Sequence, residues 1–100
     1  MTFLTCSIIV GQKKEIKKAE KLYDSGDIQG ANELLVSNET LFNNADEKVL
    51  LQKTYLEAKI DQANSKFQSS YEKFNKYKSS GGKDTEYDNN ILKLTSDIVN

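Results

Sequence analysis

The chain has 100 residues, of which 37% are hydrophobic and 29% are charged, so it can hold one small domain and is too apolar for full disorder. Its net charge is −1 and every basic residue is lysine, which leaves no cationic surplus for nucleic acid or an anionic membrane. It has no histidine, one cysteine and no proline, which excludes zinc ligand sets, removes the commonest general base and favours an all-α fold.

Residues 1–11 are predicted to be the remnant of a signal peptide. Residues 3–10 are apolar or uncharged, the small Gly11 follows them, and the chain then turns abruptly polar. Cleavage after Gly11 would leave Gln12 as the first residue of the mature chain. The usual basic residues before the apolar run are missing.

Two alternatives remain for this segment. One is a buried first strand or helix turn. The other is a lipoprotein site at Cys6, although Leu4 and Thr5 precede the cysteine where a small residue is needed. A bilayer span needs about 20 apolar residues, so no transmembrane helix is predicted in the mature chain.

Residues 13–42 are predicted to form an antiparallel helical hairpin. A first apolar stripe with helical spacing contains Ile16, Ala19, Leu22 and Tyr23. Gly26 can adopt the left-handed conformation that ends a helix, and Asp27 can cap the next one. A second stripe contains Ile28, Ala31, Leu34 and Leu35, and its helix is expected to end near Asn38, with Asn43 and Asn44 making the next turn.

This hairpin resembles the tetratricopeptide repeat. The resemblance rests on Ala19, Tyr23, Gly26, Asp27, Ile28 and Ala31, with Leu35 filling the space between the helices, and it covers about 25 residues of one repeat. A generic pair of helices in a small bundle stays open as an alternative. The apolar start followed by this hairpin is also similar to exported tetratricopeptide proteins of the Bacteroidetes, especially flavobacteria, which are longer chains.

Residues 45–78 allow two interpretations. Asp46 can cap a helix that starts at Glu47, and no glycine interrupts the apolar spacing that follows, which suits one long helix. A turn near residues 61–65 would instead produce a second hairpin. The repeat period of about 34 residues places that turn near Ile60, although the glycine is absent there and Ser65 stands at the position of the small alanine. The resemblance favours two helices.

An aromatic ladder runs through this stretch at spacings of three and four, and consists of Phe67, Tyr71, Phe74 and Tyr77. Such spacing is typical of a buried helix stripe, so packing in the core is the main interpretation. Stacking on a base or sugar is the alternative, and it makes this the one patch where a small ligand is conceivable.

Residues 79–84 form a Ser/Gly linker, and residues 85–100 are predicted to begin a further helix that continues in a longer protein. Thr85 resembles the start of a capping box, and a stripe follows at Tyr87, Ile91, Leu94 and Ile98. The alternating Asp84, Glu86 and Asp88 are not predicted to bind calcium, since Asn89 and Thr95 occupy the positions where a calcium loop needs glycine and glutamate.

The sequence therefore predicts an all-α protein of antiparallel helical hairpins that is not an enzyme and carries no cofactor or metal. The resemblance implies a protein–protein interaction scaffold of the bacterial cell envelope, in the periplasm or at the outer membrane, with an unidentified protein or peptide partner. Its candidate partner surface on the first helix consists of Lys13, Lys17, Glu20 and Asp24. The alternative is a self-contained small helical bundle with a structural or oligomerisation role.

Overall fold

A computed structural model describes residues 2–43, 45–84 and 86–99, with side chains from residue 11 onward. Within these residues there are helices and turns and no strand, so the predicted all-α class is confirmed. The elements in chain order are α1 (Thr2–Asp24), α2 (Ile28–Ser37), the 3-10 helix η1 (Glu39–Phe42), α3 (Glu47–Ala63), α4 (Phe67–Ser79) and α5 (Tyr87–Val99).

The chain divides into two compact units, Met1–Lys53 and Thr54–Asn100. The division falls inside α3, whose first residues belong to the first unit and whose remaining turns belong to the second.

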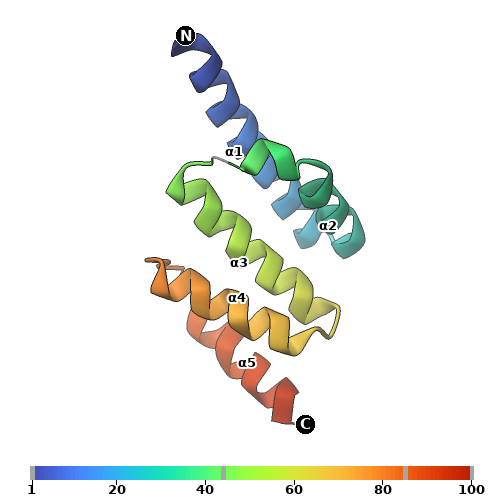
Figure 1. The fold of residues 1–100 in the computed structure, drawn as a ribbon. Coiled ribbons are helices and arrows are strands. Elements are labelled where there is room, and N and C mark those ends of the chain that lie inside the picture. The colour runs from blue at the N-terminus through green and yellow to red at the C-terminus, as the bar shows by residue number, and fades with distance from the viewer. Residues whose placement is uncertain (1, 44, 85, 100) are drawn as a thin grey trace. The chain divides into compact units, whose positions relative to one another are not determined.

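The first unit is built on the hairpin of α1 and α2, which lie side by side (Figure 1). Gly26 has a φ of 94°, so the chain reverses in a conformation that glycine adopts at little cost. The Asp27 side chain caps α2 by accepting a hydrogen bond of 2.9 Å from the backbone N–H of Gly30. Both predicted roles are confirmed.

Small residues allow the two helices of this hairpin to approach closely. Ala19 of α1 and Ala31 of α2 are fully buried, and Leu35 is almost so. Larger side chains at the two alanine positions would hold the helices apart. Of the other residues expected to pack here, Tyr23 and Ile28 are half-buried. Helix α2 ends at Ser37 with Asn38 as its cap, as expected.

After α2 the chain forms η1, where the sequence predicted only a turn at Asn43 and Asn44, the second of which lies outside the described residues. Phe42 of η1 is buried in the core. The side-chain amide of Gln12 donates a hydrogen bond of 2.8 Å to the carbonyl of Leu41, which ties η1 to α1. Gln12 is itself buried, so this bond is shielded from water.

Helix α1 begins at Thr2, well before Lys13, where the helical spacing was predicted to start. Gly11 and Gln12 therefore lie within a continuous helix. A helical conformation in the uncleaved chain does not test whether a peptidase cuts there, so the signal peptide stays a prediction.

The second unit contains another hairpin, formed by the later turns of α3 and by α4. The chain turns between Ala63 and Phe67, so two helices occupy this stretch instead of one long helix. Ser65 adopts a positive φ of 62°, which is the only such non-glycine residue in the described part of the chain. Deeper in the hairpin, the hydroxyl of the fully buried Ser70 donates a hydrogen bond of 2.7 Å to the carbonyl of Ala58.

The two hairpins have the same local design, but with a different spacing from the one predicted. Their left-handed turn residues are residues 26 and 65, a spacing of 39 residues and not 34. The same step relates the buried Ala19 to Ala58 and the buried Ala31 to Ser70. Ser65 was therefore assigned wrongly, because it occupies the position of the turn glycine, while Ser70 takes that of the small alanine.

This turn yields a stability prediction. A left-handed conformation costs a non-glycine residue about 1 kcal/mol, so Ser65→Gly is expected to stabilise the second unit by up to about 1 kcal/mol. Gly26→Ala should destabilise the first unit by a similar amount, since the added Cβ has open space but an unfavourable φ. Urea unfolding followed by circular dichroism measures both. A loss of stability in Ser65→Gly would contradict the assignment of strain to this turn.

Beyond α4 the chain breaks where predicted, because α4 ends at Ser79 and Gly81 has a φ of 99°. Helix α5 then packs along α4 (Figure 1). Its stripe is buried at Leu94, half-buried at Tyr87 and Ile91, and exposed at Ile98. The predicted cap at Thr85 lies outside the described residues.

Candidate functional site

The predicted partner surface occupies one face of α1. Lys13, Lys17 and Asp24 are exposed and Glu20 is half-buried. Their spacing of four, three and four residues places them in one row along the helix. The row carries two positive and two negative charges, so it has no strong electrostatic preference of its own.

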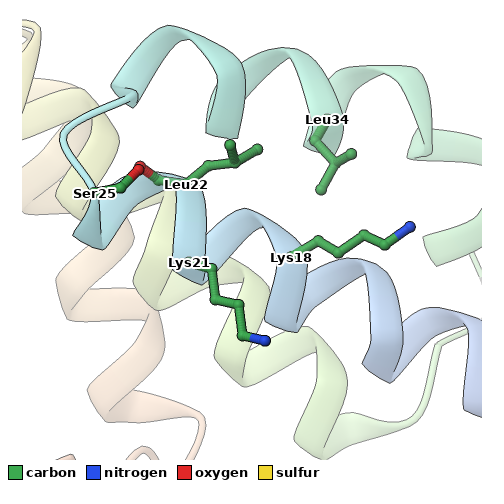
Figure 2. Close-up of a pocket in the computed structure, with 5 residues that line it drawn as sticks. All are labelled: Lys18, Lys21, Leu22, Ser25 and Leu34. Carbon is green, nitrogen blue, oxygen red and sulfur yellow. The ribbon is translucent and has the colours of Figure 1, made fainter.

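A groove that the sequence did not predict lies between α1 and α2 and has a volume of about 400 Å³. It is lined by Lys18, Lys21, Leu22, Ser25 and Leu34. Figure 2 shows Leu22 and Leu34 projecting into the space between the two helices, with Lys18 reaching along α1 and Lys21 extending from α1 away from α2. Lys18 and Leu22, four residues apart, form a row of α1 different from that of Lys13 and Lys17, and Lys21 lies between the two rows.

The charged side chains that line this groove are positive. Its lining contains two lysines and no acidic residue. Lys18 makes a loose ion pair with Glu15, with 3.6 Å between Nζ and Oε1, and its side chain is 54% exposed. Lys21 is exposed and has no ion-pair partner among the described residues. The arrangement thus combines an apolar floor with accessible positive charge.

The predicted aromatic ladder is only partly a core feature. Phe74 and Tyr77 are buried, whereas Phe67 is half-buried and Tyr71 is 38% exposed. The buried pair packs with an aromatic residue outside the ladder, because the Tyr55 ring lies 5.5 Å from that of Phe74 and 4.7 Å from that of Tyr77. The cluster is therefore part of the packing of the second unit, and the two rings that are buried in it, Phe74 and Tyr77, are not exposed for stacking on a ligand.

Polar groups at the edge of this cluster hold the linker between α4 and α5. The Tyr55 hydroxyl accepts a hydrogen bond of 2.6 Å from the Asn90 side chain and lies 3.2 Å from Asp84 Oδ1, to which it donates. The Tyr77 hydroxyl accepts one of 2.7 Å from the backbone N–H of Asp84. Gly82 is buried against the Tyr77 ring, where a Cβ would overlap the ring atoms. These bonds fix the position at which α5 begins.

Burial raises the pKa of Tyr55 far above its usual range, and the nearby Asp84 carboxylate raises it further. The folded protein therefore holds Tyr55 neutral at pH values where the unfolded chain ionises, near pH 10. Since the folded pKa is raised, this stability is present below pH 10 and is lost as the pH rises toward the folded value.

The expected result is that unfolding free energy falls more steeply above about pH 10 in the wild type than in Tyr55→Phe. The limiting difference in slope is about 1.4 kcal/mol per pH unit. Urea unfolding between about pH 8 and pH 11 measures both proteins, and because the lysines titrate in both, the difference isolates Tyr55. Equal slopes would show that Tyr55 ionises freely in the folded chain.

One ion pair lies near the turn of the second hairpin. Asp61 Oδ2 accepts hydrogen bonds of 2.6 Å from both the Ser69 hydroxyl and Lys73 Nζ. Asp61 is nearly buried and Lys73 is half-buried, so the pair joins α3 to α4 in partial isolation from water. The carboxylate, the hydroxyl and the ammonium group are hydrogen-bonded within this one contact, so we interpret it as part of the packing of the hairpin.

Among the described residues, no three acidic or cysteine side chains lie together as metal ligands. Asp84 instead accepts bonds from Tyr55 and from the backbone N–H of Glu86. In the same part of the chain, no helix is both long enough and apolar enough to cross a bilayer.

Comparison with known proteins adds no relative, because no family model, no curated protein and no solved structure matches this chain.

Proposed function

We propose that this chain is a non-catalytic segment of a tetratricopeptide-like scaffold that binds a protein or peptide in the bacterial cell envelope. The observation that carries the proposal is the recurrence of one hairpin design, with left-handed turns at Gly26 and Ser65 and small buried residues at matching positions. Helical hairpins repeated along a chain are the units of extended interaction surfaces.

The binding part of the proposal is tested by selecting peptides from a random display library on the immobilised full chain. A binding scaffold should enrich a convergent motif, and the enriched peptides should bind more weakly to variants with reversed charges on α1. Lys76→Glu on α4 is a suitable control, because Lys76 is exposed in the other unit. Selection that yields no convergent motif over repeated rounds would contradict a binding role.

The location in the envelope is supported only by the apolar start of the sequence, and a reporter fusion tests it. Alkaline phosphatase joined to the end of the full chain is active only where its disulfides form, outside the reducing cytosol. The fusion should be active in a Gram-negative host, and Ile9→Lys in the apolar run should abolish that activity. Activity that does not depend on residue 9 would count against export by this segment.

A second candidate function is oligomerisation of a small helical bundle. It is favoured by the apolar residues that α5 leaves exposed, since Leu92 is 72% and Val99 is 79% exposed. Multi-angle light scattering distinguishes the two candidates. A concentration-dependent mass that returns to the monomer in Leu92→Ser would support oligomerisation, and a monomer at all concentrations would remove it.

A further inference from the structure

We infer that the groove between α1 and α2 is the docking site for an acidic amphipathic helix of a protein partner. The inference rests on the proposed binding function and names both the surface and the chemistry of the partner. It places the contact at Lys18 and Lys21, which line the groove, and not at Lys13 and Lys17, to which the sequence pointed.

The floor of the groove sets the first requirement on the partner. Leu22 and Leu34 project between the antiparallel helices and leave a space of about 400 Å³ open to the surface (Figure 2). Two packed helices present a furrow that accepts the side-chain ridge of a third helix, in the way that amphipathic peptides occupy hydrophobic grooves. The partner therefore offers leucine-like side chains three and four residues apart.

The rim sets the second requirement. Lys18 and Lys21 border the groove, and no acidic side chain lines it. Lys21 is available for an incoming carboxylate, and Lys18 can exchange its 3.6 Å contact with Glu15 for a closer one. A partner with glutamate or aspartate beside its apolar ridge matches this pattern, whereas a basic helix would be repelled.

An acyl chain fits this groove less well than a helix. The apolar lining is confined to two leucines and the stems of two lysines, with Ser25 closing one end. Lipid tails need a longer continuous apolar surface, because each methylene gains little on its own. Two or three side chains of a partner helix, by contrast, can make all their apolar contacts within this short groove.

The test uses a fluorescein-labelled helical peptide with leucines three and four residues apart flanked by glutamates, titrated with the full chain. We expect saturable binding in fluorescence anisotropy, and a several-fold weaker Kd when NaCl rises from about 50 mM to about 300 mM. Peptides with serine for leucine or lysine for glutamate should each bind at least about tenfold more weakly.

The protein variants locate the contact. Lys18→Glu combined with Lys21→Glu is expected to raise the Kd at least about tenfold, since both side chains are exposed and the surface ion pair of Lys18 with Glu15 contributes little to stability. Lys13→Glu combined with Lys17→Glu is the matched control, with the same helix and the same change in net charge. It should change the Kd less than about twofold.

Other outcomes overturn the inference in distinguishable ways. Loss of binding only in the Lys13 and Lys17 variant would move the partner to those two lysines and leave the proposed function standing. Binding to phosphatidylglycerol vesicles but not to the peptide would make the occupant a lipid. Self-association that disappears in the Lys18 and Lys21 variant would make it a second copy. Absence of peptide binding overturns the assignment of the groove as a docking site. The proposed binding function is tested separately, by the selection from the peptide library.

Discussion

Phe74→Ala is expected to destabilise the second unit by about 3–5 kcal/mol. Phe74 is fully buried, and its ring makes T-shaped contacts with both Tyr55 and Tyr87, with centroids 5.5 Å and 6.2 Å away. Removing the ring leaves a cavity and ends both aromatic contacts. Since small domains are stable by only about 5–15 kcal/mol, the variant should lose much of its helical signal at moderate urea. Circular dichroism during urea unfolding measures the change.

Tyr71→Ala is the matched control, because Tyr71 lies on the same helix but is 38% exposed. It should cost less than about 1 kcal/mol. Large losses of stability in both variants would mean that Tyr71 is buried as well as Phe74, which would contradict its exposure at the surface. Small losses in both variants would mean that neither ring belongs to a core.

Ala31→Leu and Ser70→Leu are expected to produce the second large effect, because both residues are fully buried at the close approach of two helices. The larger isobutyl side chain of leucine must push the helices apart, which costs about 1–3 kcal/mol at each site and at times more. Ser70→Leu also removes the donor of the hydrogen bond to the Ala58 carbonyl, so its loss should be the larger. Melting temperatures and urea midpoints report both.

Asn32→Leu and Glu72→Leu provide controls on the same two helices, since both residues are exposed. Each should change stability by no more than about 0.5 kcal/mol. The pairing also tests the spacing of 39 residues between positions 31 and 70. If Ser70→Leu behaved like Glu72→Leu while Ala31→Leu was strongly destabilising, the two hairpins would not share one design.

The sequence predicted the first hairpin well because its signals are local. Gly26 and Asp27 act through their own backbone and through Gly30, three residues from the cap, so their residue types are sufficient to identify the turn. The second turn is harder to locate, because its left-handed position is occupied by Ser65 and not by a glycine, which would have indicated a turn. The expected repeat length then placed the alanine position five residues too early, at residue 65 in place of 70.

The candidate groove and the aromatic cluster depend on contacts that spacing along one helix does not reveal. Leu34 joins the groove from a different helix, and α1 alone does not show which of its polar rows faces α2. Tyr55 meets Asp84 and Asn90, partners 29 and 35 residues away. The sequence around Tyr55 does not indicate which residues its hydroxyl group contacts.

The hydrogen bond from the Gln12 side chain to the Leu41 carbonyl would depend on where a signal peptidase cut the chain. If the peptidase cuts after Gly11, Gln12 acquires a free α-amine, and an amino-terminal glutamine can cyclise: its amine bonds to the side-chain carbonyl carbon and ammonia leaves. The nitrogen that leaves is the one that donates to the Leu41 carbonyl. A cut one residue earlier would spare this donor, and a cut one residue later would remove the residue altogether, so cleavage at this point would decide how firmly η1 is held.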